Sequence, residues 1–311
     1  FLTAGYVRGK GYKHGNWQVK ATYKGLWPIL QLEFKSGRDD DFTNDYAIRI
    51  SGTQQIDTVR TTYKFQRTKG IATVQFPFNI SRKNYYRSIT PYVKYEIQAL
   101  TGFDFKNFYL LDHNRWTPIS SNNPYTSVIG KPENIKLQVM RYGLILNNQT
   151  RMSSRDIYPR WGQRLEIGYE HTPFSGLDYG NSKWVEARFY LPGFWTHHSW
   201  TLYFGHQLKS SKTLNYYGNQ INSPRGISLS GYDLSTLRIS YAFPFWYPDA
   251  HVGPILYMKR FTAEPFFDAG WEKNRYHDTT FQSYGIEISA ATHFFRLPFP
   301  INVGFRTGYE T

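Results

Sequence analysis

The chain has 311 residues, a formal net charge of +14 and no cysteine. The lack of cysteine excludes a disulfide framework and thiolate chemistry, and the sequence contains no apolar run of about 18 residues, the length that a membrane-spanning helix needs. Aromatic residues make up 19% of the chain, a share typical of interfaces with lipid. Lysine and arginine are spread along the whole sequence instead of forming one basic run, which disfavours nucleic acid as a partner.

Apolar and polar residues alternate one by one in most segments of the chain. Across residues 185–189, valine, alanine and phenylalanine alternate with glutamate and arginine. A period of two predicts β-strands with one apolar and one polar face. Because the polar faces are charged and the apolar faces aromatic, the pattern favours lipid outside and water inside. The predicted fold class is all-β, a transmembrane antiparallel β-barrel of about 16 strands.

The predicted strands follow one another along the whole chain as a single barrel domain over residues 1–311. The strand count is odd, whereas bacterial barrels favour even numbers, so we expect either a misread segment or a further strand beyond Thr311. Since Phe1–Val7 already has a strand pattern, we expect the chain to be the C-terminal part of a longer protein. The expected strands lie near residues 1–9, 15–24, 27–36, 43–52, 56–67, 69–81, 88–100, 135–147, 161–172, 182–192, 198–209, 233–246, 256–270, 281–296 and 300–310.

Two long polar connections interrupt this series, near residues 101–134 and 210–232. In outer-membrane barrels the long loops lie outside the cell and the short turns lie in the periplasm. A shorter, unusual run at 156–162 is expected to be a turn between strands, with Tyr158 and Trp161 at the membrane interface.

Two short motifs break the alternation in the C-terminal third of the chain. Arg225 and Gly226 lie in the second long connection, and the pattern Phe266-x-Asp268-x-Gly270 ends a later predicted strand. In this order they resemble the paired motifs of the BamA/TamA and two-partner-secretion translocator superfamily of outer-membrane β-barrels. The specific resemblance covers roughly residues 220–311, and the earlier part matches in pattern.

The resemblance implies a lumen loop that is paired with the barrel wall. Arg225 would pair with Asp268, because a guanidinium in a partly desolvated lumen needs a carboxylate and can bind it in a fixed geometry. Gly226 and Gly270 would allow close backbone approach. The sequence departs from the superfamily pattern at Ile227, where an aromatic residue is usual.

The resemblance also implies a function, namely assembly or secretion of outer-membrane or surface proteins in the bacterial outer membrane, without enzymatic turnover or a cofactor. The expected partners are outer-membrane lipid, lipopolysaccharide, and client outer-membrane proteins or envelope-complex subunits. Two other functions stay open: a pore or transporter that the charge of +14 makes selective for anions, and a barrel that anchors a subunit of an envelope complex.

Other polar clusters carry weaker signals. His197 and His198 are adjacent, and adjacent residues on a strand point to opposite faces, which disfavours a metal site. Residues 39–41 are three aspartates without the spacing and glycine of a calcium loop. A further group is expected to face the lumen as a structural charge network: Arg164, Glu166, Glu170, Glu186 and Arg188.

Overall fold

The computed structural model is built almost entirely of β-strands. It describes residues 2–7, 16–25, 27–49, 56–112, 115–120, 125, 128–129, 133–153, 155–174, 180–210, 218–229, 231–253, 255–274, 278–294 and 301–311. Within these residues, sixteen strands form one sheet. The strands are β1 (Leu2–Val7), β2 (Asn16–Tyr23), β3 (Ile29–Arg49), β4 (Ile56–Gln75), β5 (Phe78–Asn79), β6 (Tyr85–Asp112), β7 (Arg115–Ile119), β8 (Ile135–Thr150), β9 (Gly162–His171), β10 (Asn181–Pro192), β11 (Ser199–Lys209), β12 (Asp233–Trp246), β13 (Ala250–Val252), β14 (Leu256–Lys273), β15 (Asp278–Phe294) and β16 (Ile301–Glu310).

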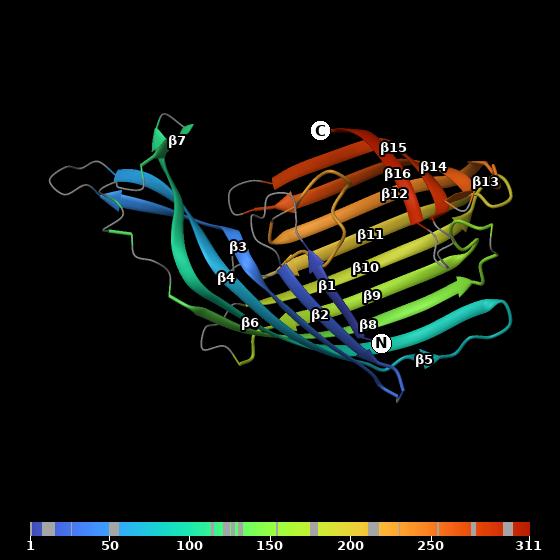
Figure 1. Ribbon diagram of the computed structural model, residues 1–311, viewed down its shortest axis with the longest axis horizontal. Coiled ribbons are helices and arrows are strands. Elements are labelled where there is room, and N and C mark those ends of the chain that lie inside the picture. Colours follow the sequence, from blue (N-terminus) through green and yellow to red (C-terminus); the bar gives the residue numbers. More distant parts are fainter. Residues whose placement is uncertain are drawn as a thin grey trace. The chain divides into compact units, whose positions relative to one another are not determined.

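The hydrogen-bonded order of the strands follows the chain. The main path is β1-β2-β3-β4-β6-β8-β9-β10-β11-β12-β14-β15-β16, with short β5 and β7 paired to β6 and short β13 paired to β14. The described registers are antiparallel. Strands β9 to β12, β14 and β15 lie side by side in this order (Figure 1). The predicted all-β antiparallel fold of about 16 strands is therefore confirmed.

The strand boundaries differ from the predicted ones in several places, and the short strands β7 and β13 are not among the predicted strands. The segments predicted at 27–36 and 43–52 merge into the continuous β3. Those predicted at 56–67 and 69–81 merge into β4, which ends at Gln75, and Phe78–Asn79 form the separate short strand β5. The expectation that residues 101–112 belong to a loop is wrong, because β6 continues to Asp112. Phe103 and Phe108 explain this extension, since both rings are buried against the neighbouring strand β4.

The chain forms two compact units. Unit 1 comprises residues 1–74, 94–140 and 172–177, and unit 2 comprises residues 75–93, 141–171 and 178–311. In unit 1, aromatic side chains from β4 and β6 form a core in which Phe65 and Phe103 stack with ring centroids 5.3 Å apart. Unit 2 contains both motifs singled out from the sequence, and the candidate site lies within it.

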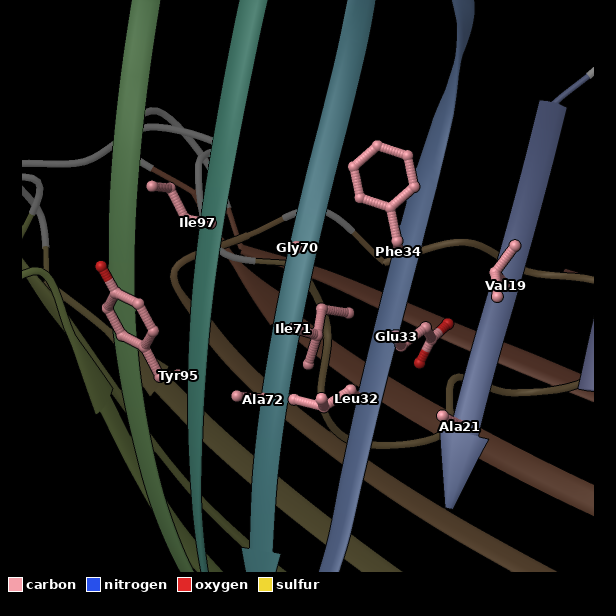
Figure 2. Close-up of a pocket in the computed structure, with 10 residues that line it drawn as sticks. All are labelled: Val19, Ala21, Leu32, Glu33, Phe34, Gly70, Ile71, Ala72, Tyr95 and Ile97. Atoms are coloured by element: carbon pink, nitrogen blue, oxygen red, sulfur yellow. The ribbon is translucent and has the colours of Figure 1, made fainter. Parts of the chain in front are cut away.

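Apolar side chains are exposed on one face of the sheet while polar side chains are covered on the other. In unit 1, Leu32 is 62% exposed, whereas the next residue, Glu33, is partly covered and accepts a hydrogen bond of 2.8 Å from Gln18 Nε2. Figure 2 shows Leu32 and Phe34 on β3 beside Val19 on β2, around a shallow depression of about 310 Å³ on this face. This arrangement is the reverse of a soluble protein.

Unit 2 has the same arrangement on β14. Phe267 and Trp271 are 39% and 43% exposed, whereas Asp268 and Glu272 are buried. The described residues include no helix that is long and apolar enough to cross a membrane. The sheet of unit 2 thus turns its charges toward the covered face, and the candidate site is built on that face.

Candidate functional site

The loop between β11 and β12, described over residues 218–229, is tied to β11 by side-chain amides. Gln207 donates from Nε2 to the Gly218 carbonyl at 3.2 Å and accepts at Oε1 from the Gln220 amide at 2.8 Å. Asn219 closes the loop on itself, because its Nδ2 donates to the Leu229 carbonyl at 2.6 Å. These bonds satisfy backbone groups that a covered loop would otherwise leave unpaired.

Apolar side chains of the same loop pack against the sheet. Ile221 and Leu229 are buried together with Trp184 on β10 and Leu234 on β12. Ile227 also packs against this cluster. Burial of this kind contributes roughly 1.5–3 kcal/mol per fully buried aliphatic side chain, so the loop is a packed element of unit 2.

Arg225, at the tip of the loop, makes three hydrogen bonds to β14. Its backbone N–H donates to Asp268 Oδ2 at 2.9 Å and its Nη1 donates to Asp268 Oδ1 at 3.2 Å. Its Nη2 donates to Glu264 Oε1 at 3.0 Å, and its guanidinium carbon lies 4.3 Å from the centre of the Phe266 ring. Arg238 on β12 adds a second cation, with Nε 3.3 Å from Asp268 Oδ2. Two guanidiniums therefore balance two carboxylates, which a buried ionic site requires.

Two glycines make room for this contact. Gly226 has φ +84°, a backbone conformation that favours glycine, and a Cβ added there would lie 1.7 Å from Glu310 Oε1. A Cβ added at Gly270 would lie 2.7 Å from Pro224 Cγ. Larger residues at these two positions would push the loop away from β14 or from β16.

The Phe266 ring lies between the arginine and the last two strands. A Cβ added at Gly285 on β15 would lie 3.0 Å from Phe266 Cζ, and one added at Gly308 on β16 would lie 3.4 Å from it. The ring therefore covers the backbone of both strands where side chains are absent, and it offers its face to the Arg225 guanidinium. A guanidinium over an aromatic ring is attracted by the ring quadrupole.

The structure brings together all five residues of the two motifs and adds three that the sequence reasoning missed. Glu264 precedes Asp268 by four residues on one strand, so strand periodicity alone could have placed both on the same face. Arg238 could have been found only from the β12–β14 register, in which it stands opposite Asp268. Tyr158, expected from the sequence in a turn at the membrane interface, contributes a hydrogen bond to the site. Its hydroxyl donates to Glu264 Oε2 at 3.0 Å across 106 residues of sequence.

Of the five charged residues expected to form a network, four make side-chain hydrogen bonds, and the guanidinium carbon of the fifth, Arg188, lies 5.6 Å from the centre of the Tyr203 ring. Arg141 Nη2 lies 2.7 Å from Glu170 Oε2, and Arg164 Nη2 lies 2.8 Å from Glu166 Oε2. Tyr203 OH donates to Glu186 Oε1 at 2.7 Å. The covered face of unit 2 beside the loop therefore carries several charged side chains that are hydrogen-bonded to one another or to tyrosine.

The two adjacent histidines lie in and next to the turn between β10 and β11. His197 Nδ1 is 2.7 Å from Asp156 Oδ1, and His198 Nδ1 is 2.8 Å from Tyr241 OH. Burial acts to raise the pKa of Asp156, but hydrogen bonds from His197 and from the Ser153 N–H outweigh it and lower that pKa below its usual value. No group of three metal-ligand side chains occurs in the described part of the chain, and the side chains of residues 39–41 lie outside that part.

Among known proteins, the chain is similar to solved structures. Neither a family model nor a curated protein matches the chain. CdiB from Escherichia coli is similar at 12% identity and a TM-score of 0.49, over 96% of this chain and 53% of that one. CdiB from Acinetobacter baumannii matches at 10% identity and a TM-score of 0.46, over 96% and 50%. BamA from Haemophilus ducreyi lacking POTRA domains 1–3 matches at 12% identity and a TM-score of 0.43, over 96% and 67%.

The similarity to these proteins concerns the fold. The chain spans about half the length of the two CdiB structures.

Proposed function

We propose that this chain is the transmembrane barrel of a bacterial outer-membrane protein that inserts or translocates other proteins, without enzymatic turnover. The observation that carries the proposal is the fastening of the Arg225 loop to Asp268 on the covered face of β14. A loop held there by ionic hydrogen bonds can be released when another polar chain takes over those bonds, because exchange between polar partners costs little net free energy.

The two faces of the sheet support a membrane location. Apolar side chains are exposed on β2, β3 and β14, and charged ones lie on the opposite face. Lipid outside and water inside would satisfy both faces. The net charge of +14 would favour contact with anionic lipid and lipopolysaccharide at the membrane surface.

The proposed partners in function are client proteins of the outer membrane or the cell surface. An unfolded client exposes backbone amides and carboxylates, which are the groups that the ionic inner face of unit 2 can bind. The Arg225 loop would then occupy part of the path and move as the client passes.

Folding of a client in lipid vesicles tests this function. The full-length protein is reconstituted in vesicles, and a small eight-stranded outer-membrane protein unfolded in urea serves as the probe. Folding of the probe is followed by its heat-dependent shift in gel mobility. We expect faster folding than in empty vesicles and a loss of most of that gain with Arg225→Ala. As a control, Glu133→Gln changes an exposed carboxylate outside the site and should leave the rate unchanged.

Planar-bilayer conductance separates the alternatives. A large, steady, anion-selective conductance without faster client folding would favour a pore. Neither conductance nor faster folding is the result expected of an anchor barrel. Either outcome contradicts the proposed function.

A further inference from the structure

The connection between β8 and β9 (residues 151–161, described at 151–153 and 155–161) contacts β14 within unit 2. Arg260 on β14 donates from Nη1 to the carbonyls of Arg155 and Asp156, at 2.7 and 3.2 Å. Tyr158 donates to Glu264 Oε2 at 3.0 Å, and its ring stacks on Tyr190 of β10 with centroids 5.9 Å apart. Two contact points on β14 and one on β10 thus hold the segment in place.

Glu264 is shared between this segment and the loop over residues 218–229 that carries Arg225, here called the arginine loop. Its Oε1 accepts from Arg225 Nη2 at 3.0 Å, while its Oε2 accepts from Tyr158 OH at 3.0 Å. The side chains of Arg225 and Glu264 are only 11% and 14% exposed, so water replaces either partner poorly. Because one carboxylate accepts both hydrogen bonds, the bond from Tyr158 to one oxygen holds the carboxylate in the orientation in which its other oxygen accepts from Arg225.

The two segments that meet at Glu264 start from opposite ends of the strands. The arginine loop leads into β12 at Asp233, which is paired with Lys273 at the last residue of β14. Residues 155 and 156 instead contact Arg260, which lies near the first residue of β14, Leu256. In an antiparallel sheet these ends lie on opposite sides of the membrane that the strands would cross.

We propose that Tyr158 is a positioning residue for Arg225 and acts through Glu264, so that residues 151–161 at one end of the strands control how firmly the arginine loop of the other end is held. The coupling itself does not depend on what the protein transports. Its use does rest on the proposed function: a client that displaces residues 151–161 at one end would loosen the arginine loop before reaching it.

A single-cysteine reporter tests the coupling. The chain has no cysteine, so Ser223→Cys, a half-covered position in the arginine loop, gives one labelling site. The rate of maleimide labelling is measured on the purified full-length protein in detergent. We expect Tyr158→Phe to raise the rate roughly tenfold, since a hydrogen bond to a charged group is lost. Arg155→Ala is the matched control, because it alters an exposed side chain of the same segment and keeps the carbonyl that Arg260 binds.

A double-mutant cycle separates positioning from general loosening. Glu264→Gln alone should also raise the labelling rate, and adding Tyr158→Phe to it should raise the rate no further, because the two residues act through one bond. Independent, multiplying effects would overturn the proposal, as would an unchanged rate in Tyr158→Phe. If Tyr158→Phe lowers the yield of folded protein, Arg260→Gln loosens the same segment at its other contact and is expected to raise labelling to a smaller extent.

The labelling assay contains no client. An unchanged labelling rate therefore contradicts the coupling between Tyr158 and Arg225 and leaves the proposed translocation untouched. If the protein instead fails to speed client folding, the proposed function is contradicted and the coupling stands.

Discussion

Asp268 is the most enclosed charged residue of the candidate site. Its side chain has no exposed surface and lies against two guanidiniums and one backbone N–H. Removing one partner of a buried ionic group leaves the others uncompensated, at a cost of about 3–5 kcal/mol. Asp268 thus both holds the loop and stabilises unit 2.

Asp268→Asn should therefore lower the free energy of unfolding by about 3 kcal/mol or more, because Arg225 and Arg238 would then share Glu264 as their one remaining carboxylate. Urea titration of the protein in lipid vesicles measures the change. Arg225→Lys should cost less, since it keeps the charge but loses the two-pronged geometry. Equal midpoints for the wild-type protein and Asp268→Asn would contradict this account.

At the scale of elements, the arginine loop depends on shape as well as charge. Pro224 lies over Gly270, where an added Cβ would come within 2.7 Å of Pro224 Cγ. Gly218, in the same loop, has no heavy atom within 4 Å of an added Cβ. An added methyl group would therefore clash at Gly270 and would meet open space at Gly218.

We expect Gly270→Ala to cost about 1–3 kcal/mol, as overpacking usually does, and to make the loop more sensitive to protease. Gly218→Ala should leave both the stability and the cleavage rate close to those of the wild-type protein. Limited proteolysis followed by mass spectrometry of the cut sites measures the difference. Equal cleavage of the two variants would show that the loop is not seated on Gly270.

The sequence predicts these elements unevenly, for physical reasons. Alternation identifies strands such as β10, because successive residues there point to opposite faces of the sheet. It overlooks the extension of β6 past Leu100, where Phe103 and Phe108 bury their rings in a core that forms only when β4 is alongside. The bond between Tyr158 and Glu264 joins residues 106 apart, and no local pattern contains it.

At the scale of the whole molecule, both units expose apolar residues on one face of the sheet. Leu32 in unit 1 is 62% exposed and Ile288 in unit 2 is 40% exposed. In a soluble protein such positions tolerate a charge within about 0.5 kcal/mol. In a membrane barrel a lysine on the lipid face near the midplane costs about 2–4 kcal/mol.

Leu32→Lys and Ile288→Lys should therefore both lower stability in lipid vesicles by about 2 kcal/mol or more, as measured by urea titration. The neighbouring residues Gln31 and Ser289 point to the other face and are partly covered, so Gln31→Lys and Ser289→Lys serve as matched controls with much smaller losses. If only one of the two units lies in the bilayer, only the substitution in that unit will be costly. Losses that are equal on the two faces would contradict a lipid-facing surface.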